Sequence, residues 1–219
     1  MCRCCGGTLG TKAIHDMSCT CGGDNIARHN KVRDRIFGHS ARAMLQPELE
    51  KADLLDEPGV IVSMRRPADV LIQEGTPEIT QTALDVKIIN ALGPDHYNAT
   101  LGAPLKAAEA YRDQALLHQN TAVLCAAQGI AYEPLVFTCQ GGCEGHAEAI
   151  LSRIAAGIAK CEGVDTASIK AEMMEDISLC IGRSVVHAIQ KRGRPARVGT
   201  SHIRRCLEEA AEGDYDDDE

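Results

Sequence analysis

Two short apolar segments carry side chains that could hold a divalent cation. Asp69 lies in the run 68–72, and Asp85 lies two residues before Lys87 in the run 83–89. Two carboxylates can hold Mg²⁺, which lowers the pKa of a bound water, while a nearby lysine steadies the attacking hydroxide. The i, i+2 spacing places Asp85 and Lys87 on one face of a strand. The two segments therefore predict a metal-dependent phosphodiesterase, although Asp-x-Lys alone is a weak signal.

A second group of residues, at the N-terminus, has the spacing of a zinc site. Zinc prefers four sulfur or nitrogen ligands in a tetrahedron, and short spacings let one turn supply two of them. The candidate ligands are Cys2, Cys5, His15 and Cys19. Cys4 or Cys21 could replace one of these ligands, and the alternative is a set of thiols without metal. The expected structure is a small zinc knuckle over residues 1–24.

The carboxylates require strands to position them, and the apolar patterns predict such strands. The runs 68–72 and 83–89 are short, β-branched and bounded by Pro, Gly and Thr, and 130–138 reads as a further strand in which Pro134 indicates an edge or a bulge. Apolar residues at three- and four-residue spacing predict helices over 25–44, 103–128, 144–160 and 166–190. The expected fold class is α+β or α/β, with a mixed sheet flanked by helices, the knuckle before it and a helical C-terminal part.

The charge of the chain is unevenly distributed. Of the 31 acidic residues, eight lie in 208–219 together with no base, so the rest of the chain carries 23 groups of each sign and is neutral. We expect four parts: the knuckle at 1–24, a nuclease-like core at 25–160, a helical extension with a basic arm at 161–207, and a disordered acidic tail at 208–219.

Composition excludes several classes of protein. With no Trp, two Phe and four Tyr, the chain is a poor candidate for reading nucleic acid by stacking bases on aromatic side chains. No window approaches 18 apolar residues, so we expect no membrane span. The N-terminus lacks a basic-then-apolar signal, so the eleven cysteines indicate a reducing, intracellular compartment and metal rather than disulfides.

Two basic segments are candidates for contact with phosphates. The helix at 25–44 has basic residues around its apolar face, and residues 183–205 hold seven Arg or Lys and no acid. The alternatives are a solvated helix face for the first segment and balance of the acidic tail for the second. The residues expected to contact nucleic acid are Arg28, His29, Lys31, Arg35, Arg192, Arg194 and Arg197.

Several motifs together resemble those of a known family. The succession CRCC, HDMSC, GGDNIARHNKVRD, RRPADVLI, ALDVKI and CAAQGIAYEPLVF, over residues 1–160, resembles the endonuclease region of site-specific non-LTR retrotransposons. That region carries a restriction-like PD-(D/E)xK nuclease after a Cys-Cys-His-Cys knuckle. The three-residue spacing between His15 and Cys19 is shorter than the family usually has.

The resemblance implies a restriction-endonuclease-like sheet and an enzyme that nicks target DNA with Mg²⁺ or Mn²⁺. It implies Zn²⁺ at the knuckle, His29 beside Arg28 at the start of the helix behind it, and Mg²⁺ at Asp69 and Asp85. Tyr111 and Arg112 would lie near the phosphate. The implied catalytic residues are Glu50, with Glu48 as the less favoured acid, and Asp69, Asp85 and Lys87.

The resemblance also implies partners for the chain. They are DNA, RNA and an upstream reverse transcriptase domain that lies outside this chain, in the nucleus, so we expect the chain to be a fragment of a longer protein.

Two other readings compete with an active nuclease. One is an inactive retroelement remnant, or domesticated module, that binds nucleic acid through the knuckle and the basic helix. The other is a structural nucleic-acid chaperone in which Asp69, Asp85 and Lys87 form only a buried ion pair.

Overall fold

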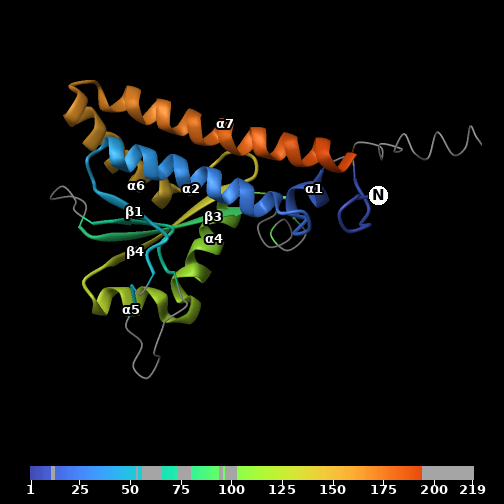
Figure 1. Ribbon diagram of the computed structural model, residues 1–219, viewed down its shortest axis with the longest axis horizontal. Coiled ribbons are helices and arrows are strands. Elements are labelled where there is room, and N and C mark those ends of the chain that lie inside the picture. The colour runs from blue at the N-terminus through green and yellow to red at the C-terminus, as the bar shows by residue number, and fades with distance from the viewer. Residues whose placement is uncertain are drawn as a thin grey trace, which may run out of the picture.

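The computed structural model of the protein describes residues 1–10, 13–52, 54–55, 66–73, 80–93, 96 and 103–193. Figure 1 shows the elements. In chain order they are α1 (Ile14–Ser18), α2 (Asp24–Arg42), β1 (Pro47–Leu49), β2 (Val70–Ile72), β3 (Thr82–Ile89), α4 (Pro104–Leu117), a 3-10 turn (His118–Asn120), α5 (Thr121–Ala127), β4 (Ala131–Thr138), α6 (Gly145–Glu162) and α7 (Thr166–Gly193).

The four strands form one mixed sheet in the order β1-β2-β3-β4. β1 pairs antiparallel with β2, and β2 antiparallel with β3, whereas β3 and β4 are parallel. The predicted α+β class with a mixed sheet flanked by helices is confirmed. Among the described strands β4 lies at the edge of the sheet, and Pro134 is accommodated because no neighbouring strand in the described part of the chain pairs with it on the outer side.

One face of the sheet is covered by α2, α6 and α7, which lie above it in Figure 1. Their apolar residues pack with inward residues of the strands, among them Leu84, Val86 and Phe137, in a single large cluster. Helix α7 contributes one residue per turn to this cluster: Ile169, Met173, Ile177 and Ile181. The helix that was expected as part of a C-terminal extension therefore shares the core of the fold.

The other face of the sheet is covered by α4 and α5, and it has two small apolar clusters instead of one large cluster. Leu71 and Ala83 pack with Cys125 of α5, while Ile89 and Val136 pack with Ala107 and other residues of α4. By the alternation of β3, Asp85 and Lys87 point to this second face. The charged pair predicted for one side of the strand therefore lies between two small apolar clusters.

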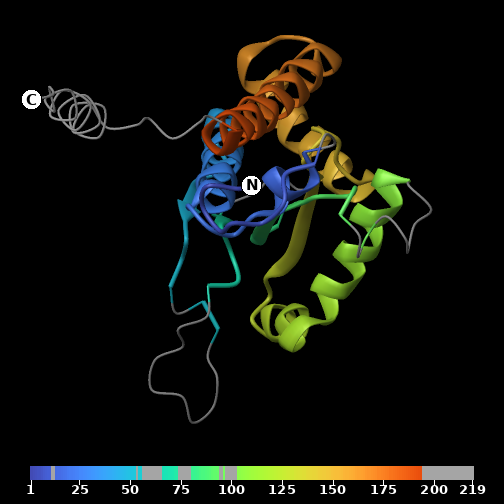
Figure 2. The same ribbon diagram turned by 90° about the vertical axis from the view of Figure 1, so that its right-hand side faces the viewer.

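Two predicted helices differ from expectation in detail. The helix expected over 103–128 is broken, because Gln119 and Asn120 have positive φ angles of 51° and 56°. In α2, Val32 and Ile36 are fully buried as expected, but Ile26 in the first turn is 68% exposed. Figure 2 shows the N-terminal segment at this end of α2 and α7.

Some expectations concern residues that the structure does not describe. The acidic tail at 208–219 and the arm residues Arg194 and Arg197 lie outside the described residues. Within the described ranges, none of the helices has the length and apolar character needed to span a bilayer.

Candidate metal centres

Three acidic residues, Glu50, Asp69 and Asp85, lie on neighbouring segments of the sheet, next to the end of β1 and the start of β2. The backbone N–H of Glu50 donates to the Asp69 carbonyl at 3.1 Å, and the Asp69 N–H donates to the Leu84 carbonyl at 2.9 Å. Asp85 is the next residue on β3. The folding of β1, β2 and β3 therefore places the backbones of Glu50, Asp69 and Asp85 side by side, from positions up to 35 residues apart in the sequence.

The Asp69 carboxylate is fixed by two neighbours. Its Oδ2 accepts a hydrogen bond from the Val86 N–H at 2.7 Å and lies 3.0 Å from His29 Nε2. Burial disfavours the charged form of this group, but the contacts with His29 and Val86 outweigh it and hold the pKa of Asp69 below its usual value. The hydrogen bond to Asp69 in turn raises the pKa of His29. Asp69 is therefore ionised and oriented.

Asp85 lies between a lysine and a tyrosine. Lys87 Nζ is 2.8 Å from Asp85 Oδ1, and the Tyr132 hydroxyl donates to Asp85 Oδ2 at 2.7 Å. Burial raises the pKa of Asp85, against the effect of Lys87 and Tyr132, and the Asp69 charge adds to the increase. Burial lowers the pKa of Lys87, but Asp85 outweighs it, so the pKa is raised and the ammonium is retained. The two carboxylates are thus close enough to repel.

A cavity of about 270 Å³ opens beside Asp85 and Lys87, between β3, β4 and α4. The Tyr111 side chain lies in its wall, as expected from its place on the helix after β3. Arg112, which was expected near the same site, instead pairs with Asp113 at 3.5 Å. The residues that line the cavity are Asp85, Lys87, Tyr111, Gln114, Ala115, His118 and Tyr132.

Glu50 does not join the carboxylate pair in the way that was predicted. Its carboxylate is held by Arg33 of α2 and by Arg66 at 2.9 Å. The other acid considered, Glu48, pairs with Lys51 at 2.7 Å. The backbone of Glu50 therefore lies beside Asp69, but its carboxylate, expected at the catalytic site, is paired with two guanidinium groups.

The four predicted zinc ligands converge. The ligand atoms of Cys2, Cys5, His15 and Cys19 all lie within 4.8 Å of one another, so the set could bind zinc. Cys19 Sγ is 3.9 Å from Cys2 Sγ and 3.7 Å from Cys5 Sγ, and Cys5 Sγ is 3.2 Å from His15 Nε2. For zinc–sulfur bonds of about 2.3 Å, sulfurs at two corners of a tetrahedron are about 3.8 Å apart, so the spacing of the cluster fits the ion.

The positions of the alternative ligands and of one glycine support the choice of these four residues as zinc ligands. Cys4 and Cys21, which could have replaced a ligand, are not members of the cluster of ligand atoms. A Cβ on Gly7 would lie 2.6 Å from Cε1 of His15, so the ring reaches its place only because Gly7 has no side chain. This contact explains one of the two glycines that follow Cys5.

No family model, curated protein or solved structure matches this chain.

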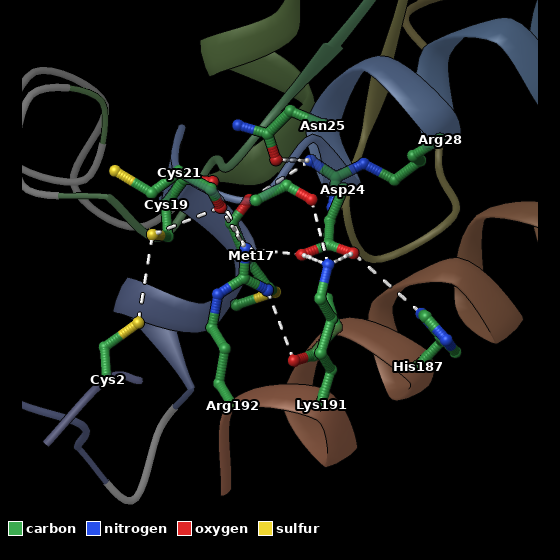
Figure 3. Close-up of polar contacts among 12 residues, drawn as sticks. Cys2, Met17, Cys19, Cys21, Asp24, Asn25, Arg28, His187, Lys191 and Arg192 are labelled. Atoms are coloured by element: carbon green, nitrogen blue, oxygen red, sulfur yellow. Dashed lines mark hydrogen bonds and ion pairs between the residues drawn. The ribbon is translucent and has the colours of Figure 1, made fainter. Parts of the chain in front are cut away.

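The C-terminal end of α7 holds the knuckle in place, as Figure 3 shows. Arg192 Nη2 is 2.8 Å from Asp24 Oδ2 and donates to the carbonyls of Cys19 and Cys21 at 3.4 and 3.2 Å. Lys191 Nζ donates to the Gly22 carbonyl at 2.9 Å and also reaches Asp24. The knuckle is therefore anchored to the longest helix of the fold.

Two predicted phosphate contacts are wrong, because their side chains are internal. Arg192 is 1% exposed and is engaged by Asp24 and the knuckle carbonyls. Arg28 is also buried, and its Nη2 donates to the Met17 carbonyl at 3.1 Å. Both guanidinium groups tie the knuckle to helices, which a count of basic residues along the sequence does not reveal.

Other predicted contacts remain at the surface. Lys31 and Arg35 are exposed and line a groove between α2 and α7, with Arg183 on its other side. Arg35 also lies 3.3 Å from Asp176. His29, expected among the nucleic-acid contacts, is at the carboxylate site instead.

Sequence reasoning missed two contacts of the carboxylate site, that of His29 with Asp69 and that of Tyr132 with Asp85. His29 precedes Asp69 by 40 residues, and Tyr132 follows Asp85 by 47. No local spacing connects them to the acids. The one available signal was the alternation of β4, which places Tyr132 and Pro134 on the face that Asp85 occupies in the parallel register.

Proposed function

We propose that the chain is a Mg²⁺- or Mn²⁺-dependent DNA endonuclease domain of a retrotransposon-derived protein, with a restriction-endonuclease-like sheet. It would nick target DNA by phosphodiester hydrolysis. The observation that carries the proposal is the convergence of Asp69, Asp85 and Lys87 on one face of a mixed sheet, beside a cavity that opens to solvent.

The donor set fits a hard divalent cation. The Asp69 and Asp85 side chains are 17% and 12% exposed, and the charge of one raises the pKa of the other. Such oxygen ligands are the ones that Mg²⁺ prefers. When bound there, the ion would act as a Lewis acid on a phosphate and on a water. Asp69 and Asp85 are the residues that would hold it.

The remaining residues of the site bind and orient. Lys87 is 37% exposed and retains its proton, so its ammonium can bind a non-bridging phosphate oxygen from the cavity. Tyr132 donates to Asp85 Oδ2, while Lys87 lies at Oδ1, so both oxygens of that carboxylate are oriented by a neighbour. Small apolar clusters lie on either side of the acids.

The partners belong to the same proposal. DNA is the substrate, RNA and an upstream reverse transcriptase domain are further partners, and a DNA target places the protein in the nucleus. The surface cations Lys31 and Arg35 support contact with phosphates because both are exposed. Zn²⁺ at the knuckle would hold the first turn of the chain against α2 and α7.

A second candidate function is favoured by one observation. Glu50, the third acid implied by the resemblance, is occupied by Arg33 and Arg66. A site reduced to two carboxylates would suit a retroelement-derived module that binds nucleic acid and no longer cuts. In that case the contacts of Asp85 with Lys87 and Tyr132 would serve only stability.

Nicking of supercoiled plasmid with Mg²⁺ or Mn²⁺ distinguishes the two functions. We expect nicking by the wild type, loss of at least a hundredfold in Asp85→Ala, and normal nicking in Asp113→Ala, whose carboxylate on α4 is 72% exposed. Nicking that survives in Asp85→Ala would contradict the assignment. DNA binding without nicking by the wild type would favour the binding module.

A further inference from the structure

We infer that His29 is a positioning residue for the carboxylate site, which fixes Asp69 so that one oxygen remains for a divalent cation. The inference rests on the proposed function, because it assigns His29 a role within that cation site. His29 was expected to contact nucleic acid, and its role here is at the carboxylate site instead.

Both donors to Asp69 bind the same oxygen. His29 Nε2 and the Val86 N–H lie 3.0 and 2.7 Å from Oδ2, and among the described residues no donor is found at Oδ1. A carboxylate oxygen with two such partners has little freedom to rotate, so Oδ1 is left as the atom that can bind a cation. Hydrogen bonds of this kind commonly orient a ligating carboxylate.

Helix α2 gives His29 a fixed place beside β2. Val32 and Ile36, on the next two turns, are fully buried in the large cluster between the sheet and α2, α6 and α7. Arg28, the preceding residue, is buried and its Nη2 donates to the Met17 carbonyl of the knuckle and to Asn25 Oδ1, both at 3.1 Å. The imidazole therefore belongs to a helix that is fixed by the core after His29 and by the contacts of Arg28 before it.

The knuckle also touches the strand that carries Asp85 and Lys87. Asn90, directly after β3, donates from Nδ2 to the Ile14 carbonyl at 3.0 Å and to Ser18 Oγ at 2.7 Å. Helix α1 of the knuckle therefore contacts both the element that presents His29 and the element that presents Asp85.

The test compares two substitutions at one position. His29→Leu removes the donor, whereas His29→Gln can place an amide N–H where Nε2 lies. In plasmid nicking, we expect His29→Leu to raise the Mg²⁺ concentration for half-maximal rate at least tenfold with the KM for DNA unchanged, and His29→Gln to restore most of the difference. His187→Leu, at a 70% exposed side chain on α7, is the control and should behave as wild type.

Several outcomes would overturn the inference. They are a Mg²⁺ requirement of His29→Leu equal to wild type, an effect confined to the KM for DNA, or equal impairment of both variants while circular dichroism shows both folded. If the wild type does not nick, the proposed function fails, and Mn²⁺ binding by electron paramagnetic resonance tests His29 separately. Weaker Mn²⁺ binding in His29→Leu than in wild type would support positioning, and equal binding or none in the wild type would refute it.

Discussion

The zinc knuckle and the carboxylate site differ in how their residues are brought together. The knuckle ligands come from 18 consecutive residues, and the chain needs only two turns to gather them. The carboxylate site gathers residues from α2, from the position before β2, and from β3 and β4, so it exists only when these elements have come together. The ligands of the first site are local in the sequence, whereas the residues of the second site are brought together by the tertiary fold.

The two sites also differ in whether their polar side chains already have partners within the protein. In the knuckle, the thiol groups face one another with one imidazole, and a metal ion is what would satisfy them. In the carboxylate site, each acid already has a protein partner, His29 for Asp69 and Lys87 with Tyr132 for Asp85. Metal removal should therefore affect the fold strongly at the knuckle and weakly at the carboxylates.

The largest expected effect is at the knuckle, where replacing a zinc ligand should cost far more stability than replacing a nearby thiol. Cys19→Ser should reduce the zinc content from about one ion per chain to almost none and lower the free energy of unfolding by several kcal/mol, because structural zinc contributes directly to folding. Cys21→Ser, at an exposed thiol outside the cluster, should retain the metal. Elemental analysis with urea unfolding measures both. Equal zinc in the two variants would exclude Cys19 as a ligand.

A smaller effect is expected where α7 holds the knuckle. Arg192→Met should destabilise the protein by about 3 kcal/mol, because it leaves a buried Asp24 without its internal guanidinium partner. Lys191→Met is the matched control, since its 41% exposed ammonium binds the same carboxylate and should contribute about 1 kcal/mol or less. Urea unfolding measures the difference. Equal effects of the two substitutions would show that burial of Arg192 does not matter.

The smallest effect concerns the carboxylate site. Tyr132→Phe removes the hydrogen bond to Asp85 Oδ2 and should cost about 1 kcal/mol, while zinc content stays unchanged. Thermal unfolding and elemental analysis measure the two quantities. A loss of zinc in this variant would mean that the two sites are not as separate as their geometry indicates.

Sequence reasoning succeeded where the determinants were local. The alternation of 83–89 predicted the faces of Leu84 and Asp85, and the Cys and His spacings predicted the four converging ligands. The short β-branched runs also predicted strands β2, β3 and β4, and the mixed sheet expected with the family resemblance is present.

It failed where a side chain's partner was distant in the sequence. Arg192 and Arg28 looked like surface cations, yet both are internal because the knuckle carbonyls and Asp24 pack against them. Glu50 was expected to be a catalytic acid, but its carboxylate pairs with Arg33 of the preceding helix. Strand β1 was missed, because three residues after a helix give no periodicity.

Binding of Mn²⁺ to the zinc-loaded protein in the presence of a duplex oligonucleotide tests the central claim most directly. The claim is that Asp69 and Asp85 form a divalent cation site separate from the knuckle. We predict that the wild type binds Mn²⁺, seen as loss of the free-ion electron paramagnetic resonance signal, and that Asp85→Asn loses this binding while keeping about one zinc per chain. Equal Mn²⁺ binding by the two proteins, or none by the wild type, would contradict the account.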